Sequence, residues 1–403
     1  MTTPTGGGHP STDRETGAWA RWHAFPHPVL RRLRGLKWAA RGVMRRVQGP
    51  TVLIRWSRGG SDALALDPGP SRTGRVRLNG PALRAAIGAA RVDSPAAEPR
   101  AVRRFRETMG ATTAGVFRIE FPHRCTPVSV VAKVFRPPAG RGDPRELAAY
   151  ASGLLTRLPH PCAAPRVHAC LRNKDGTSVL LLEDLGQQPD RMWRPMALDE
   201  YRRAAEALGR MGARFATDPP RASWLATGTT VRHAREWLLP EDWRSRLSPH
   251  GALFRRLTRA SRHAPNVIEA FSDLAPTLCH QDATPRNIAM GTPAAGDRVV
   301  LLDWEMCGLG PLGQDLASLV WSLWRFAAVE QLVAREAAAL DGYLTGIASE
   351  GVALSASRKR EIRLAYLVTA AVRYLVEIAN VARYETVDVA TARFEEAVSL
   401  VTQ

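Results

Sequence analysis

Apolar and polar positions alternate in a strand-like pattern that begins near Arg106. Val116–Phe121 and Val128–Phe135 are rich in β-branched and aromatic residues, which favour pleated strands. The proline-flanked segment between them supplies a turn, so the pattern predicts a β-hairpin. Ser178–Leu182 is a further short apolar run, typical of a buried strand.

The rest of the chain is dominated by helical periodicity. Pro144–Leu158 and Leu198–Phe215 repeat apolar residues three and four positions apart, as amphipathic helices do. From Asp315 to Gln403 the pattern is almost wholly helical. Two short apolar runs, Ile288–Met290 and Val299–Leu302, bracket a turn between these helices. We therefore expect a small β-rich part followed by a larger, mostly helical part.

The chain before Arg106 has a different character. Residues 1–20 contain few large apolar groups and are expected to form a mobile tail. Residues 28–47 have a loosely helical pattern with arginines between the apolar positions, which predicts a basic amphipathic helix. Short strands are expected at Val52–Trp56 and Arg75–Leu78. We treat this whole segment as an N-terminal extension.

The formal net charge of +18 is concentrated in this extension. Residues 1–106 contain 20 Arg and Lys against 6 Asp and Glu, a balance of +14, so residues 107–403 carry only +4. A charge of that size is ordinary for a soluble enzyme, so we expect no nucleic-acid partner. The basic segment 28–47 is compatible with contact to an anionic membrane surface, and equally with packing on the rest of the protein.

Length and composition are those of a folded protein. The 403 residues are 45% hydrophobic, enough for one large two-lobed unit or two to three ordinary domains. No run of about 18 apolar residues occurs, and the start of the chain lacks the layout of a signal peptide. The cysteines form no C-x-x-C pair, so we interpret them as reduced thiols and expect a cytoplasmic protein. They are Cys125, Cys162, Cys170, Cys279 and Cys307.

A polar run between two apolar stretches carries the strongest chemical signal. Asp282 and Asn287 lie five positions apart, and Asp303 follows 16 residues after Asn287. Phosphoryl transfer needs a carboxylate that orients the attacking hydroxyl and accepts its proton, and oxygen ligands for the magnesium that neutralises the triphosphate. Asp282 suits the first task, and Asn287 and Asp303 suit the second. The short hairpin between the two metal ligands would bring both to one edge of a nucleotide.

This pattern resembles the catalytic and metal loops of the aminoglycoside phosphotransferase and choline kinase superfamily, which read H-x-D-x-x-x-x-N and then I-D-[WF]. The resemblance implies an α+β, protein kinase-like, two-lobed fold, with a small β-rich N-lobe at 107–186 and a larger, mostly helical C-lobe at 187–403. It implies ATP and Mg²⁺ as cofactors, and transfer of the γ-phosphate to a hydroxyl of a small-molecule acceptor such as an aminoglycoside, amino alcohol or sugar. It also implies that His280 braces the loop rather than acting as a base, and that Asp315 begins a helix and ties back to the loop.

Lys133 is the candidate that would anchor the phosphates. It lies in an apolar strand, where an unpaired ammonium would be costly. Glu146, 13 residues later in a predicted helix, is its natural partner, and such a pair positions the α- and β-phosphates in kinases. Asp143 lies nearby and could compete. Without the downstream loops, Lys133 could equally extend from an edge strand into solvent.

Two weaker elements complete the predicted nucleotide site. Gly110, Thr112 and Thr113 stand just before the first strand, where a nucleotide-covering loop belongs. An ordinary loop would explain them as well. The apolar run that ends at Glu183 and Leu185 resembles the connector between the two lobes, whose backbone would hydrogen-bond adenine. The alternative is a buried strand that ends in a polar turn.

Departures from protein kinases favour a small acceptor. Protein kinases usually place a lysine two positions after the catalytic aspartate and follow the metal aspartate with Phe-Gly, whereas this chain has Thr284 and Trp304 there. Arg286 could approach the γ-phosphate or lie in solvent. Aromatic residues of the C-terminal helices could wall an acceptor pocket or form core, and three glutamates could attract a cationic amine. These residues are Trp321, Trp324, Tyr343, Tyr366 and Tyr374, and Glu305, Glu377 and Glu385.

Two other functions compete with the small-molecule kinase. One is a catalytically silent kinase-like module that binds a ligand or partner, which the intact set of Lys133, Asp282, Asn287 and Asp303 argues against. The other is a membrane-surface kinase, held on anionic lipid by residues 28–47 and acting on a glycolipid. The sequence carries no signal that fixes the acceptor, the choice between ATP and GTP, or the oligomeric state.

Overall fold

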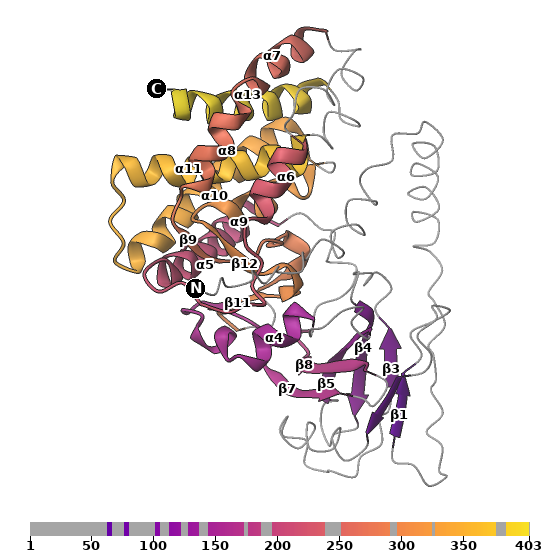
Figure 1. Cartoon of the computed structure of the whole chain (residues 1–403). Helices are drawn as coiled ribbons and strands as arrows, with labels where there is room; N and C mark the ends of the chain where they lie inside the picture. Colours follow the sequence, from indigo (N-terminus) through magenta and orange to yellow (C-terminus); the bar gives the residue numbers. More distant parts are fainter. Residues whose placement is uncertain are drawn as a thin grey trace, which may run out of the picture.

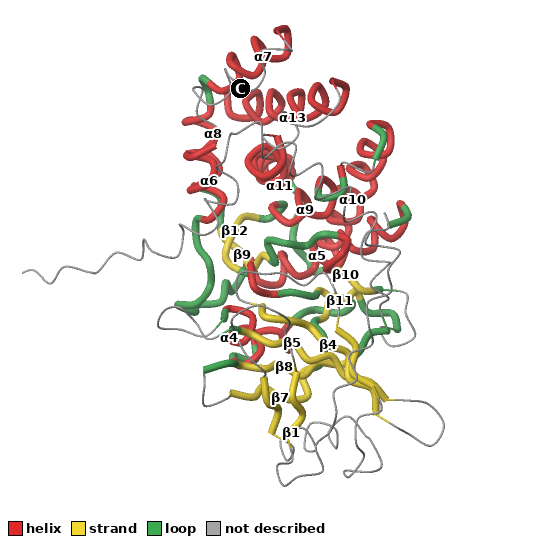
Figure 2. Tube along the Cα trace, turned by 90° about the vertical axis from the view of Figure 1, so that its right-hand side faces the viewer, coloured by secondary structure: helices red, strands yellow, loops and turns green. Residues whose placement is uncertain are grey.

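The computed structural model separates strands from helices. A sheet lies at one end of the molecule, helices fill the other end, and short strands lie between them (Figures 1 and 2). The structure describes residues 63–66, 76–79, 101–104, 113–121, 128–136, 144–172, 176–186, 196–237, 251–290, 296–324, 327–375 and 384–402. The large sheet and the helical part are called the sheet lobe and the helical lobe below.

The sheet lobe is built on a five-stranded antiparallel sheet in the order β3-β4-β5-β8-β7. Its strands are β3 (Ala101–Arg104), β4 (Thr113–Phe121), β5 (Val128–Phe135), β7 (Val167–Arg172) and β8 (Ser178–Glu183). The predicted hairpin is confirmed as β4 and β5. In β4 the side chains of Phe117, Ile119 and Phe121 are buried while the residues between them are partly exposed, because successive side chains point to opposite faces of a strand.

The sheet takes in residues from before the expected lobe boundary at Arg106. Strand β3 pairs antiparallel with β4, with Ala101 opposite Glu120. The boundary was set where alternation begins, and the four residues of β3 are too few to display it. Further upstream, β1 (Ala63–Leu66) and β2 (Val76–Asn79) form a separate two-stranded ribbon. The predicted helix at 28–47 and the predicted strand at 52–56 lie outside the described residues.

In the helical lobe, helix α5 (Leu198–Ala216) packs closely against helix α10 (Val329–Ser349). A Cβ at Gly209 would lie 2.2 Å from the carbonyl oxygen of Tyr343, and one at Gly342 would lie 2.1 Å from that of Arg202. The absence of side chains at these positions lets the two backbones approach each other. The helices of the lobe are α5 (Leu198–Ala216), α6 (Thr229–Trp237), α7 (Gly251–Ser261), α8 (Ala264–Ser272), α9 (Gln314–Trp321), α10 (Val329–Ser349), α11 (Ala356–Ala370) and α13 (Tyr384–Thr402). A π-helical turn, Ala371–Leu375, follows α11.

The predicted helix at Pro144–Leu158 is interrupted. Helix α4 (Arg145–Ala151) ends before Gly153, which has a left-handed φ of 72°, and a 3-10 helix continues over Leu154–Arg157. Leu154 and Leu155 pack in the same hydrophobic core as the helices of the helical lobe. This part of the expected N-lobe segment therefore joins the two lobes.

Short strands between the lobes carry the loops of interest. Strand β10 (Ile288–Ala289) pairs antiparallel with β11 (Val299–Leu301), as the bracketed turn predicted. The other side of β11 pairs in parallel with β6 (Cys162–Ala163). Strands β9 (Pro276–Cys279) and β12 (Gly308–Pro311) form a second antiparallel pair, which the sequence did not predict because these runs of four contain proline and glycine and do not alternate.

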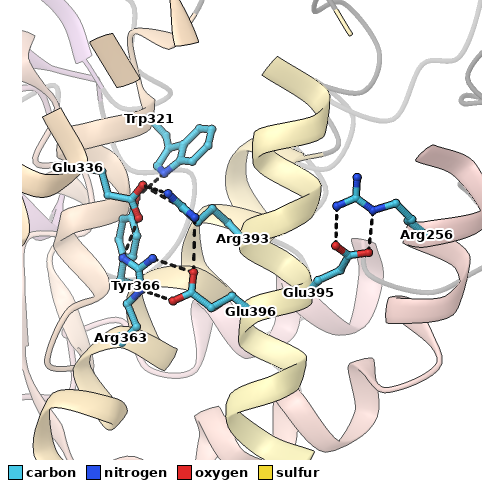
Figure 3. Close-up of polar contacts among 8 residues, drawn as sticks. All are labelled: Arg256, Trp321, Glu336, Arg363, Tyr366, Arg393, Glu395 and Glu396. Atoms are coloured by element: carbon cyan, nitrogen blue, oxygen red, sulfur yellow. Dashed lines mark hydrogen bonds and ion pairs between the residues drawn. The ribbon is translucent and has the colours of Figure 1, made fainter. Parts of the chain in front are cut away.

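An ionic network ties the C-terminal helix to its neighbours (Figure 3). Glu336 of α10 accepts hydrogen bonds from Arg363 of α11 at 2.7 Å and from Arg393 of α13 at 2.9 Å. Arg363 also donates twice to Glu396, at 2.6 and 2.8 Å. The Glu336 side chain is 5% exposed, so these partners replace water around a buried carboxylate. The network therefore fixes α13 against α10 and α11.

None of the helices in the described ranges combines the length and the hydrophobicity that crossing a membrane requires.

Candidate active site

The backbone of the loop that follows β9 is held by one aspartate, Asp315. Asp315 stands in the first turn of α9, and its carboxylate accepts hydrogen bonds from the backbone N–H groups of His280 at 2.8 Å and Gln281 at 2.7 Å. Gln281 has a left-handed φ of 62°, a conformation that is unfavourable for a residue with a Cβ. The buried carboxylate of Asp315 offsets that cost and fixes the direction in which the chain continues.

His280 braces the loop with both ring nitrogens. Its Nε2–H donates to the carbonyl of Leu302 at 2.9 Å, and its Nδ1 accepts from the backbone N–H of Asp282 at 3.3 Å. The ring is fully buried and meets the edge of Trp304, with centroids 4.7 Å apart. Burial lowers the pKa of His280, so the ring is neutral at pH 7. With both nitrogens engaged it links two loops and is not placed to act as a base.

The lowered pKa of His280 predicts a loss of stability in acid. In the unfolded chain the imidazole takes up a proton below about pH 6.5, whereas the folded protein resists it until lower pH. The stability that comes from neutral His280 is therefore complete above about pH 6.5 and is lost as the pH falls below that value, by at most about 1.4 kcal/mol per pH unit.

Urea unfolding of the wild type and of His280→Gln between about pH 7.5 and 5 checks this prediction. Glutamine can still donate to the Leu302 carbonyl but does not titrate. The free energy of unfolding should fall less steeply with decreasing pH in the variant than in the wild type. Parallel pH profiles for the two proteins would contradict the assignment of the acid sensitivity to His280.

Asp282 lies at the turn of this loop with one carboxylate oxygen engaged. Asn287 donates through Nδ2 to the Asp282 carbonyl at 2.9 Å and to its Oδ2 at 2.8 Å. The other oxygen, Oδ1, has no hydrogen-bond partner among the residues that the structure describes. Burial raises the pKa of Asp282, and the positive charges of Arg286 and Arg373 oppose that rise. The side chain is 22% exposed, so Oδ1 can receive a proton from a bound molecule.

Asn287 and Asp303 come together through the β10–β11 hairpin. The Leu302 N–H donates to the Asn287 carbonyl at 2.7 Å, which places Asp303 beside Asn287 at the end of the ladder. Asp303 has a left-handed φ of 64°, tolerated by aspartate more readily than by most residues, and its side chain is 46% exposed. The pair presents the amide Oδ1 of Asn287 and the carboxylate of Asp303, and oxygen donors of this kind suit Mg²⁺.

No group of three or more His, Cys, Asp or Glu that could hold a metal ion occurs within the described ranges. Mg²⁺ is usually bound through one or two carboxylates together with substrate phosphates and water. Zinc, by contrast, is usually held by four protein ligands in a structural site and three in a catalytic one.

Lys133 connects the sheet lobe to this loop system. Its Nζ donates to Glu146 of α4 and, at 2.7 Å, to Oδ1 of Asp303. Burial alone would lower the pKa of Lys133, but the carboxylates of Asp303 and Glu146 outweigh it and raise the pKa, so the ammonium stays charged. The side chain is 9% exposed, which excludes the alternative of a lysine extended into solvent. Asp143, the possible competitor for this pairing, lies outside the described residues.

The two carboxylates that share Lys133 have pKa values shifted in opposite directions. Burial opposes ionisation of Asp303, yet the adjacent ammonium lowers its pKa. For Glu146, burial together with the negative charge of Asp303 raises the pKa to about 7, against the attraction of Lys133. Like charges close to one cation disfavour a second ionisation. A bound cation at Asp303 would relieve this repulsion and favour the charged form of Glu146.

Only part of the predicted nucleotide-covering loop lies within the described residues, together with the predicted connector. Gly110 and Thr112 lie outside the described residues, and Thr113 is the buried first residue of β4. At the connector, Leu185 is buried and packs against strands β10 and β11. The N–H of Leu185 has no hydrogen-bond partner among the residues described here, so it is available to a ligand.

The side chain of Glu183 is more constrained than the sequence suggested. Its carboxylate accepts from Arg298 at 2.9 and 3.2 Å, and from the backbone N–H and Nε of Arg166 at 2.8 and 3.0 Å. Although burial opposes ionisation, these donors lower the pKa of Glu183. Arg298 precedes β11, so Glu183 ties the connector to the hairpin that carries Asn287 and Asp303.

Sequence reasoning missed two arginines near the site. Arg145, at the start of α4, donates to the carbonyls of Glu305 at 2.7 Å and Trp224 at 3.0 Å. It thereby holds the helix that carries Glu146 against the segment after Asp303. Arg373 lies in the π-helical turn after α11, and no local pattern marks it.

The aromatic residues considered as pocket walls are mostly core. Trp321 donates to the hydroxyl of Tyr366 at 2.7 Å, and both are buried (Figure 3). The hydroxyl of Tyr343 accepts from Gly313 at 2.8 Å. Glu305, considered as an attractor for an amine, lies beside Arg145, and burial raises its pKa. Glu385 is exposed, and Glu377 lies outside the described residues.

The protein has a β-sheet lobe and a helical lobe, and Lys133 of the sheet contacts Glu146 of α4 and Asp303, which follows β11 between the lobes. This arrangement is that of a protein kinase-like fold. The sequence matches the model of the phosphotransferase enzyme family over residues 96–349. The chain belongs to this family, and the resemblance noted from its loops is confirmed at that level.

The chain is also similar to solved structures of small-molecule kinases. The microcompartment-associated aminopropanol kinase is 14% identical, with a TM-score of 0.47, over 79% of this chain and 95% of that one. Choline kinase from Cryptosporidium parvum Iowa II is 12% identical, with a TM-score of 0.46, over 79% of this chain and 94% of that one. The GDP complex of wild-type aminoglycoside 2'-phosphotransferase-IIIa is 15% identical, with a TM-score of 0.42, over 76% of this chain and 95% of that one. A comparison with curated proteins gives no match.

Proposed function

We propose that the protein transfers the γ-phosphate of ATP to a hydroxyl group of a small molecule. One observation carries the proposal: Lys133 of the sheet lobe contacts Asp303, which follows β11 between the lobes, beside the bonded pair of Asp282 and Asn287. In the proposed reaction these neighbouring side chains would serve as an anchor for phosphates, as oxygen ligands for a metal and as a proton acceptor. Phosphoryl transfer needs these parts and little covalent chemistry from the protein.

Each side chain has a distinct task in the proposed reaction. Lys133, held by Glu146, binds the α- and β-phosphates. Asn287 and Asp303 hold Mg²⁺, which when bound neutralises the charge of the triphosphate. The free Oδ1 of Asp282 accepts a hydrogen bond from the acceptor hydroxyl and orients it toward the γ-phosphorus. The free N–H of Leu185 binds the adenine ring.

Calorimetric titration of the full chain with ATP, in the presence and absence of Mg²⁺, is the first test. We expect binding that tightens with the metal. Acceptor-dependent release of ADP, measured over the rate without acceptor, then separates an enzyme from a silent kinase-like module. A chain that does not bind ATP in the presence of Mg²⁺ would refute the proposal, and nucleotide binding without turnover on any acceptor would favour the silent module.

Replacing Lys133 by methionine should weaken ATP binding by about 10- to 100-fold, the loss expected for a charge-assisted hydrogen bond. Methionine preserves the length and apolar part of the side chain but cannot bind phosphate. The dissociation constant for Mg–ATP checks this result. Lys359→Met is the matched control, because Lys359 is exposed on α11 and should leave the constant unchanged. Equal constants for K133M and the wild type would contradict the assignment.

A further inference from the structure

Two arginines from separate elements act electrostatically on the carboxylate of Asp282. Arg286 stands in the 3-10 helix Pro285–Asn287, with its Nη2 3.5 Å from Oδ2 of Asp282. Arg373 stands in the π-helical turn, and its Nη1 donates to the hydroxyl of Ser318 at 2.7 Å. Ser318 is one turn along α9 from Asp315, whose carboxylate holds the backbone of the catalytic loop. The two guanidinium groups are therefore fixed relative to that loop.

Most of the hydrogen-bonding capacity of these arginines is unused. A guanidinium has five N–H donors. Among the described residues, Arg373 makes its one hydrogen bond to Ser318, and Arg286 makes its one ionic contact with Asp282. Arg373 is half-buried, and the Arg286 side chain is 42% exposed. Both can still donate to a molecule that reaches Asp282.

The carboxylates near Asp282, those of Asp303 and Asp315, already have hydrogen-bond partners. Asp303 is bound to Lys133 and faces the proposed metal position. Asp315 accepts from the loop backbone. Asp282 feels its strongest outside charges from Arg286 and Arg373, with Asp303 a weaker influence. The two guanidinium groups are thus the neighbouring charges that act most strongly at the position of the acceptor hydroxyl.

A helix beside the π-helical turn adds positive charge. Helix α6 packs against this turn and carries Arg232 and Arg235, both exposed. These two charges would repel a polycation and attract an anion.

We propose that the acceptor carries an anionic group, a carboxylate or a phosphate, close to the hydroxyl that is phosphorylated, and that Arg373 and Arg286 bind this group. The inference rests on the proposed phosphotransferase function and narrows its substrate class. Arginine suits the task because its planar donors match the oxygens of carboxylate and phosphate. The same charges would disfavour a polycationic aminoglycoside as the acceptor.

The chemical step balances with the groups named. The acceptor oxygen forms a bond to the γ-phosphorus while the bond from that phosphorus to the bridging oxygen of ADP breaks. The hydroxyl proton passes to Oδ1 of Asp282 and from there to solvent. The products are ADP and an acceptor that carries both its original anionic group and a new phosphate ester, and Arg373 holds the original group throughout.

Binding of simple ions tests the inference without knowledge of the natural acceptor. The full chain is first saturated with Mg²⁺ and a non-hydrolysable ATP analogue, so that the γ-phosphate position is filled. Inorganic phosphate, acetate and methylammonium are then titrated in by calorimetry. We expect one or both anions to bind and methylammonium not to bind. Binding of methylammonium alone, or of no anion, would overturn the proposal.

Variants assign the binding to the guanidinium. Arg373→Gln retains a donor for Ser318 but loses the charge, and it should weaken anion binding by about 10-fold or more. Arg373→Lys should restore part of the loss. Arg358→Gln on exposed α11 surface is the matched control and should bind anions as the wild type does. Unchanged anion binding in R373Q, or loss of analogue binding instead, would place Arg373 outside the acceptor site.

Turnover on matched acceptors separates the two kinds of anion. The three-carbon set is glycerate, glycerol 3-phosphate, glycerol and 3-amino-1,2-propanediol, and kcat/KM is measured from ADP release. An anionic member should exceed the neutral and cationic members by about 10-fold, and the preferred anion identifies carboxylate or phosphate. Preference for the amine would overturn the inference while leaving the phosphotransferase function intact. Failure of the ATP analogue to bind at all would instead count against the proposed function.

Discussion

Replacing Asp282 by asparagine should lower the turnover of acceptor phosphorylation by about three orders of magnitude, while the affinity for Mg–ATP stays within about twofold. The substitution keeps the size of the side chain, and the asparagine oxygen can still accept from Asn287 Nδ2. What is lost is the negative charge at the free oxygen, which would accept the hydroxyl proton. A positioned proton acceptor contributes about 10²- to 10⁴-fold to such reactions.

The expected separation of turnover from nucleotide binding follows from the geometry. Asp282 contacts neither Lys133 nor Leu185, which are the groups assigned to the nucleotide. Its carboxylate is bonded to Asn287 on one side and open on the other. Loss of its charge should therefore affect the hydroxyl and leave the phosphates bound.

Single-turnover measurements with the best acceptor from the matched set, together with calorimetric titration of Mg–ATP, would check this prediction. Asp273→Asn is the matched control, since Asp273 is an exposed carboxylate at the end of α8, and it should have wild-type kinetics. Near-normal turnover in D282N would refute the role of Asp282. A large loss of nucleotide affinity in D282N would show that the residue belongs to the nucleotide site.

The parts of the fold that were predictable are those whose signal is local. The β4–β5 hairpin was readable because its strands alternate and a turn joins them. The pairing of Lys133 with Glu146 followed from a lysine in an apolar strand and a carboxylate 13 residues later. The contact of Lys133 with Asp303 spans 170 residues, and no local pattern predicted it.

The parts that were missed depend on tertiary contacts. Strands β9 and β12 are short and contain proline and glycine, so each has little strand propensity without the other. Glu183 was assigned a role through its backbone alone, whereas Arg166 and Arg298 bind its side chain. Arg373 lies in a helical segment with no motif, and its relation to Asp282 becomes visible only when α9 and α11 are packed together.

Glu336→Gln should have the largest effect on stability among the changes considered, lowering the free energy of unfolding by about 3 kcal/mol. Glutamine has the same shape, but the NH₂ group that replaces one carboxylate oxygen donates and cannot accept from the second arginine. Arg363 and Arg393 are 21% and 25% exposed, so water can hydrate them only in part. Removal of this carboxylate leaves two partly buried guanidinium groups to share one remaining carboxylate, that of Glu396.

Thermal unfolding should show a decrease in Tm of about 3–5 °C for Glu336→Gln, on the scale of about 1–1.5 °C per kcal/mol that the entropy of unfolding implies for a chain of 403 residues. Glu361→Gln is the matched control, because the same chemical change there removes a surface pair with Arg358 in which both side chains are 38% exposed, and the expected loss is below about 0.5 kcal/mol. The contrast isolates burial as the cause, since both substitutions remove one carboxylate from an arginine. Equal melting temperatures for the two variants would contradict this prediction. Helix α13 would then be held mainly by its apolar contacts, and the buried ion pairs would add no net stability.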